Sequence, residues 1–250
     1  MRYMHFASRN FKELVRDPLS WIFCLGFPIV MLVLMTVINE SIPPEAGMTL
    51  FQIQNLAPGI MIFGYTFIML FASMLLSGDR TEAFLLRLYT SPMTSFDFIA
   101  GYLIPLAVLA LGQAAINLIT ALIIGAFTGI SLSISGALIA VVLSIPAILM
   151  FIGFGLLFGC VFTRNSAPGI SSIIITLSGM FGGIWMDVDA IGGVLAKLCN
   201  ALPFVHAVRS ARYAFEGCYS DSLCESGIVL IWAAAMLILS VVIFRKKMKV

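Results

Sequence analysis

Charged residues are unevenly spaced along this chain, and the gaps between them are long and apolar. The charge-free intervals run over 18–39, 46–78, 98–163, 165–186 and 226–244. A charged side chain costs roughly 2.5–3.5 kcal/mol at the centre of an inserted helix. These intervals therefore predict helices that cross a membrane.

The interval 98–163 is too long for one span, which needs about 20 residues, and the Gly/Ser/Thr-rich stretch 125–136 predicts a turn within it. The six predicted spans cover residues 21–38, 56–77, 102–125, 136–162, 168–186 and 227–244. The first is too long for the apolar part of a signal peptide, so we expect a retained helix. The fold class is an all-α integral membrane protein of one domain over 1–250.

Lysine and arginine divide unequally between the two ends of these spans. Eleven of the 14 lie in 1–17, 79–97, 163–165 and 245–250, and three lie in 187–225. The positive-inside rule then predicts that both termini are cytoplasmic. It makes 187–225 the largest outer element, and its helical patterning predicts a hairpin before the last span.

Two polar segments on the predicted cytoplasmic side also have helical patterning. In 1–17, apolar and charged residues occupy opposite arcs, with only Asn10 out of place, which predicts an interfacial helix. In 79–97, a helix carrying both signs of charge is broken at Pro92, and a second short helix is expected from Ser95. Such a loop suits a groove on another protein, and a loop lying on lipid headgroups is the alternative.

The outer segment is expected to contain a helix that begins at Pro203 and ends at Gly217. Phe204 and Val208 lie on the apolar face of this predicted helix, and His206 lies on its polar face. Three cysteines also lie in this segment: Cys199, Cys218 and Cys224. In an oxidising space they allow one disulfide, either Cys218–Cys224 or Cys199–Cys218, and three free thiols are the alternative.

Composition narrows the function classes. The chain is 61% hydrophobic and 10% charged, whereas soluble domains average about 45–50% and 25%. This excludes a soluble globule and a sizeable soluble catalytic domain. The 20 phenylalanines exclude disorder. A net charge of +2 argues against a nucleic-acid partner.

Catalytic and metal-binding patterns are missing from the sequence. Its two histidines, His5 and His206, fall on opposite sides of the predicted membrane, and no cluster has zinc spacing. No P-loop is present. No charged residue lies well inside a predicted span, where ion-coupled carriers usually place one. A transporter of this kind would take its energy from a partner.

Weakly polar residues within the spans suit helix packing, or alternatively a substrate path. The candidates for a substrate path are Thr66, Ser73, Gln113, Asn117 and Thr176. Small residues in the fourth span, Gly153, Gly155 and Gly159, permit close contact between helices.

The loop at 78–93 reads Gly-Asp-Arg-Thr-Glu-Ala-Phe-Leu-Leu-Arg-Leu-Tyr-Thr-Ser-Pro-Met. With the six spans, the interfacial helix and the Leu-Pro-Phe at 202–204 before Arg209 and Arg212, it resembles the membrane-spanning subunit of an ABC transporter of the type-2 exporter class. Members of that class typically have Glu, then Leu-x-x-Leu, then Thr/Ser-Pro here. This chain departs at 83–84, where Ala-Phe replaces the frequent Gly-Thr.

The resemblance implies a complex of two permease chains, identical or homologous, with two ATP-binding cassette subunits. ATP and Mg would be held by those subunits, and this chain would hold no cofactor. The complex would lie in the bacterial inner membrane, in contact with lipids, and export an amphiphilic substrate such as a drug, antibiotic, peptide or lipid-like molecule. A haem-exporting or other assembly-type ABC permease and a non-ABC secondary carrier are the alternatives. The expected ATPase-coupling residues are Glu82, Phe84, Leu85, Arg87, Leu88, Tyr89 and Pro92.

Overall fold

The computed structural model describes residues 2–42, 49–81 and 95–247, which form helices and no strand. The all-α prediction is confirmed. In chain order the elements are α1 (Arg2–Arg16), α2 (Pro18–Trp21), the π-helical turn η1 (Ile22–Gly26), α3 (Phe27–Ser41), α4 (Ile53–Thr81), α6 (Ser95–Thr128), α7 (Ile134–Leu143), α8 (Ile145–Val161), α9 (Ala167–Phe181), α10 (Val188–Ile191), α11 (Gly193–Ala201), α12 (Pro203–Glu216) and α13 (Tyr219–Lys247).

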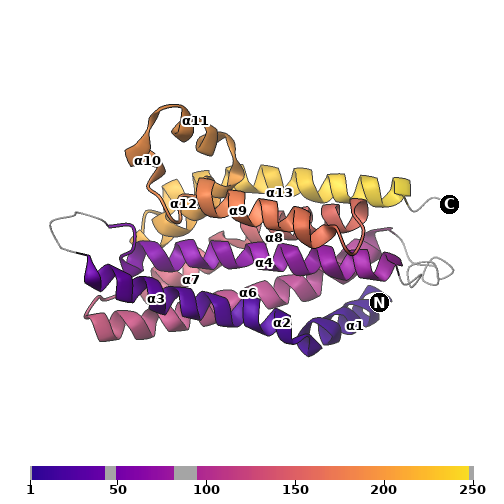
Figure 1. The fold of residues 1–250 in the computed structure, drawn as a ribbon, viewed down its shortest axis with the longest axis horizontal. Coiled ribbons are helices and arrows are strands. Elements are labelled where there is room, and N and C mark those ends of the chain that lie inside the picture. Colours follow the sequence, from indigo (N-terminus) through magenta and orange to yellow (C-terminus); the bar gives the residue numbers. More distant parts are fainter. Residues whose placement is uncertain (1, 43–48, 82–94, 248–250) are drawn as a thin grey trace.

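The long helices lie side by side along the longest axis of the molecule (Figure 1). Both chain termini are at one end, which we call the terminal end, and α10 and α11 project at the other, which we call the hairpin end (Figure 1). Among the described residues, five helical stretches are long and apolar enough to cross a membrane: Pro18–Ser41, Ile53–Arg80, Asp97–Thr128, Ile134–Val161 and Tyr219–Lys246. Each contains one of the predicted spans or nearly all of it.

The remaining predicted span, 168–186, corresponds to α9, which ends five residues earlier at Phe181. The helix stops because Gly182 and Gly183 form a turn in which Gly183 has a φ of 71°. Its 15 residues extend about 22 Å, which is less than the roughly 30 Å of a bilayer core. The helix is apolar and packs on α4, and it is shorter than the five candidate spans.

Helix α4 is the centre of the bundle and is buried along most of its length. The glycines of α8 allow this close packing. An added Cβ at Gly155 would lie 2.4 Å from the backbone oxygen of Met69, and one at Gly159 would lie 2.8 Å from Cβ of Leu76. On the other side of α8, a Cβ at Gly153 would lie 3.0 Å from Met236 in α13. The predicted close contacts of these glycines are therefore made within one chain.

At the hairpin end, α12 has the predicted arrangement. It begins with Pro203 in its first turn and ends at Gly217, which has a φ of 84°. Phe204 and Val208 are buried, and Phe204 stacks on Phe151 of α8 with ring centroids 6.1 Å apart. Thus α12 forms part of the bundle core, while α10 and α11 extend outside it.

The predicted loop 79–97 is shorter than expected at both ends. Helix α4 continues through Thr81, and α6 is one continuous helix from Ser95. The separate short helix expected from Ser95 is therefore wrong, because these residues form the first turn of a 34-residue helix. The expected coupling residues Glu82, Phe84, Leu85, Arg87, Leu88, Tyr89 and Pro92 lie outside the described residues.

Candidate functional site: the polar cluster between α4, α6 and α1

Helix α1 is docked on the first turns of α6 through an aromatic contact. Phe6 packs edge-on against Phe98 and Tyr102, with ring centroids 5.9 and 5.0 Å away. Gly101 makes room for this ring, since an added Cβ there would lie 2.2 Å from Cδ1 of Phe6. One face of α1 is therefore held by protein.

Asn10, the residue that did not fit the amphipathic pattern, lies in this contact and is fully buried. Its Nδ2 donates to the backbone oxygen of Gly101 at 3.0 Å, and its Oδ1 accepts from the guanidinium of Arg9 at 3.0 Å. A buried amide with both ends hydrogen-bonded fixes the position of α1 on α6.

Asp79, in the last turn of α4, connects the three helices. Its Oδ2 accepts a hydrogen bond from Arg9 at 2.8 Å and from the Tyr102 hydroxyl at 2.7 Å. The Asp79 side chain is only 2% exposed, whereas that of Arg9 is 35% exposed. Arg9 also forms an ion pair with Glu13 at 2.9 Å. Burial lowers the pKa of Arg9, but the hydrogen bond and charge of Asp79, together with the charges of Glu13 and Tyr102, outweigh this effect and raise the pKa above its ordinary value.

Arg80 fixes the same end of α4 to α8. Its guanidinium donates to the backbone oxygens of Gly159 at 2.7 Å and Phe162 at 3.3 Å. These oxygens belong to the end of α8, where helical carbonyls lack partners within the helix. The sequence predicted that a cytoplasmic loop begins at residue 79, but Asp79 and Arg80 belong to the last turn of α4. They make tertiary contacts with α1, α6 and α8.

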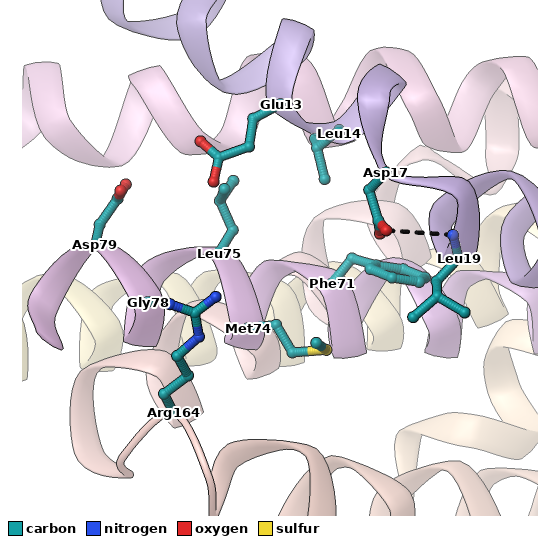
Figure 2. A pocket seen from close by; sticks show the side chains of 10 residues that line it. All are labelled: Glu13, Leu14, Asp17, Leu19, Phe71, Met74, Leu75, Gly78, Asp79 and Arg164. Carbon is teal, nitrogen blue, oxygen red and sulfur yellow. Dashed lines mark hydrogen bonds between the residues drawn. The ribbon is translucent and has the colours of Figure 1, made fainter. Parts of the chain in front are cut away.

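A cavity of about 270 Å³ opens beside this cluster. Figure 2 shows the carboxyl groups of Glu13 and Asp79 on one side of α4 side chains that include Leu75 and Met74, and the guanidinium of Arg164 on the other side. Asp17 lines the far side and is engaged in capping α2, since it accepts from the backbone nitrogens of Leu19 and Ser20. The cavity combines apolar and charged walls and lies at the terminal end.

The polar residues proposed for a substrate path are distributed over α4 and its neighbours. The hydroxyl of Thr66 donates to the Phe63 oxygen at 2.6 Å within α4. Ser73 connects α4 to α9 through the Ser171 hydroxyl at 3.0 Å. Thr176 of α9 is exposed, and its hydroxyl donates to the oxygen of Ser172 at 3.0 Å.

Gln113 and Asn117 of α6 are fully buried against α4. Gln113 donates to the Met61 oxygen at 3.3 Å, and Asn117 donates to the Ala57 oxygen at 2.9 Å. Gly64 makes room for the glutamine, because a Cβ there would lie 2.0 Å from its Nε2. The side-chain oxygens of both amides lack a hydrogen-bond partner within the described residues. This pair joins α4 to α6.

At the hairpin end, polar contacts join α12 to its surroundings. Arg212 donates to the backbone oxygen of Asn55 at 3.1 Å, and Arg209 donates to Oδ1 of Asn200 at 2.6 Å. The two ring nitrogens of His206 face the Glu225 carboxylate and the Asn200 oxygen. All five cysteines are free thiols: Cys24, Cys160 and Cys199 are buried, and Cys218 and Cys224 are exposed.

The cluster around Asp79 was not predicted, although two signals for it were present. Asn10 interrupted an otherwise regular apolar face, and Asp79 directly followed a long apolar run. Neither signal identifies its partner, because Arg9 and Asp79 are 70 positions apart.

Residues 2–215 match the family model described as ABC-2 type transporter. A search of curated proteins gave no match.

Proposed function

Because this chain belongs to the ABC-2 type transporter family, and is therefore a multi-pass permease subunit that works with an ABC ATPase, we propose that it is the permease of an ATP-driven exporter of amphiphilic molecules. Residues 82–94 would dock into the ATPase, and the terminal end of the bundle would face the cytoplasm. ATP and Mg would be bound by the ATPase, and the working complex would contain two permeases and two ATPases in a bacterial inner membrane.

The observation that supports this proposal is the hydrogen-bonded cluster at the two ends of 82–94. Asp79 lies three residues before this segment and Tyr102 eight residues after it, and they are hydrogen-bonded to each other at 2.7 Å. Arg9 of α1 donates to the same Asp79 carboxylate, and the neighbouring Arg80 donates to the Gly159 oxygen of α8. A force applied to 82–94 would thus reach four helices through short polar contacts, as coupling to an ATPase requires.

The amphiphilic substrate class follows from the character of the helix interior. Within the predicted spans, the buried polar side chains of the described residues are hydroxyls and amides, including Thr66, Gln113 and Asn117. Such an interior offers weak hydrogen bonds and apolar surface, which suits a molecule that is itself largely apolar. A small inorganic ion would find no charged ligand there.

The docking proposal is tested with Leu88→Asp. We propose that Leu88 enters an apolar groove of the ATPase, with Phe84, Leu85 and Tyr89 beside it and Glu82 and Arg87 at its rim. An unpaired charge in such a contact costs several kcal/mol. The assay measures the ATPase that co-purifies with a tagged permease from native membranes. At equal membrane abundance, the variant should retain much less ATPase than the wild-type permease does. Leu198→Asp, on the exposed face of α11, is the matched control and should retain it. Unchanged co-purification by Leu88→Asp would reject the docking role.

The substrate class has a separate test. In proteoliposomes that contain the purified permease–ATPase complex, amphiphilic peptides or drugs should stimulate ATP hydrolysis, and inorganic ions should not. Stimulation by ions alone would reject an amphiphilic substrate without affecting the docking proposal.

A further inference from the structure

Helix α1 has three faces, where the sequence pattern indicated two. One face is buried against protein and includes Phe6, Asn10 and Leu14. A second is apolar but exposed, with Met4 at 54%, Phe11 at 39% and Val15 at 37%. The third is exposed and basic, with His5, Lys12 and Arg16. In a chain that spans the membrane, an exposed apolar face beside a basic face lies where lipid tails meet headgroups.

An apolar crevice of about 250 Å³ begins at the exposed apolar face of α1. Phe11, Leu14 and Val15 form one wall, and Trp21 and Leu25 form the second. The third wall is α6, from Val108 to Ile116. These eight residue steps extend about 12 Å along the helix axis. The crevice therefore runs from the interfacial helix along α6 into the membrane-spanning part of the bundle.

Two local features keep the crevice open. Gly112 lies in the middle of the α6 wall, and an added Cβ there would meet nothing within 4 Å. Trp21 is held beside the crevice because its indole nitrogen donates to the Val15 oxygen at 2.7 Å. The adjoining chain is the π-helical turn η1, a form of helix often found at functional sites.

We propose that this crevice binds one acyl chain of an anionic phospholipid, with the headgroup phosphate held by Lys12 and Arg16. Lys12 adjoins Phe11 and Arg16 adjoins Val15, so each cation is next to a residue that lines the crevice. Neither cation forms an ion pair with another described residue. Glu13 and Asp17, the nearby carboxylates, are engaged by Arg9 and by the start of α2. Lys12 and Arg16, which are both exposed, are therefore available to a phosphate.

The ligand is a structural lipid of the leaflet at the terminal end, and it is distinct from any transported molecule. Two cations near the membrane surface favour an anionic over a zwitterionic lipid by about 30-fold, at roughly five- to sixfold for each. The lipid would cover the exposed faces of α1, η1 and α6 together. It would thereby stabilise the docking of α1 from the side opposite the Asp79 cluster.

Native mass spectrometry of the protein released from nanodiscs tests the proposal. The nanodiscs contain equal amounts of dioleoyl phosphatidylglycerol and dioleoyl phosphatidylcholine. The wild-type chain should retain one phosphatidylglycerol. Gly112→Leu places a side chain in open space within the crevice and should reduce retention at least tenfold. Gly169→Leu is the matched control, since Gly169 of α9 also has nothing within 4 Å of an added Cβ, and it should retain the lipid.

The combined variant Lys12→Gln with Arg16→Gln should bind both lipids about equally, with a loss of about 30-fold in preference. The proposal is wrong if Gly112→Leu retains phosphatidylglycerol as the wild type does, or if the double glutamine variant keeps the preference. A disulfide-linked dimer formed by Phe11→Cys in membranes, with none in the wild type, would show a second copy in the crevice and would also overturn it.

Discussion

The ion pair between Arg9 and Asp79 should respond very differently to removal of its two partners. Changing Arg9 to Gln leaves the Asp79 carboxylate, whose side chain is 2% exposed, with only the Tyr102 hydroxyl. Changing Asp79 to Asn leaves Arg9, which is 35% exposed, in contact with water and Glu13. The cost of a stranded charge depends on how deeply it is buried. Arg9→Gln should therefore be the more damaging change.

The magnitudes follow from these exposures. Breaking a buried pair by removing one partner costs about 3–5 kcal/mol, and we take the lower value of about 3 for Arg9→Gln because the site is at the membrane surface. For Asp79→Asn we expect about 1 kcal/mol, because the amide oxygen still accepts hydrogen bonds and an exposed guanidinium is stabilised by solvent. The double variant strands no charge and should cost no more than about 2 kcal/mol, so the two changes are coupled by about 2 kcal/mol.

Equilibrium unfolding in mixed micelles with increasing mole fraction of a denaturing detergent measures these free energies. Arg245→Gln is the matched control, because Arg245 is exposed on α13 and its removal should change the free energy of unfolding by less than about 0.5 kcal/mol. Equal costs for the two single variants, or strictly additive costs in the double variant, would refute the assignment of Asp79 as a buried charge neutralised by α1.

Two further predictions concern helix packing and the cysteines. Gly155→Ala should destabilise the chain by about 1–3 kcal/mol in the same unfolding assay, because its Cβ would lie 2.4 Å from a backbone oxygen of α4. Gly169→Ala is the control and should cost far less, because a Cβ there meets nothing within 4 Å. Equal costs for the two variants would argue against close α4–α8 packing. In intact cells, a membrane-impermeant maleimide should label the exposed Cys218 and Cys224, and it should label the buried Cys199 much more slowly. Burial raises the pKa of the Cys199 thiol, and this effect outweighs the lowering effects of Arg209 and of a backbone hydrogen bond. Labelling of Cys218 only after the membrane is permeabilised would reverse the proposed orientation.

Several parts of the fold were predictable because the chemistry of one residue type determines the local structure there. A charge is costly inside a bilayer, so the gaps between charges located the five long spans. Pro203 and Gly217 fixed the ends of α12, because one is favoured in the first turn of a helix and the other adopts a positive φ. The apolar and charged arcs of residues 2–16 likewise predicted an amphipathic helix, and the structure has one.

The tertiary structure decided what each apolar or charged face contacts. A protein interior and the lipid tails of a membrane are both apolar environments. The sequence pattern of α1 therefore could not distinguish the face that packs on α6, near Phe6, from the face that is exposed, near Phe11. The end of α9 depended on a turn at Gly182–Gly183 within a run that stays apolar to Met186. Asp79 at the end of a span has the same sequence signature whether water or Arg9 neutralises it. Its role depends on a partner 70 positions away, and only the folded chain brings the two together.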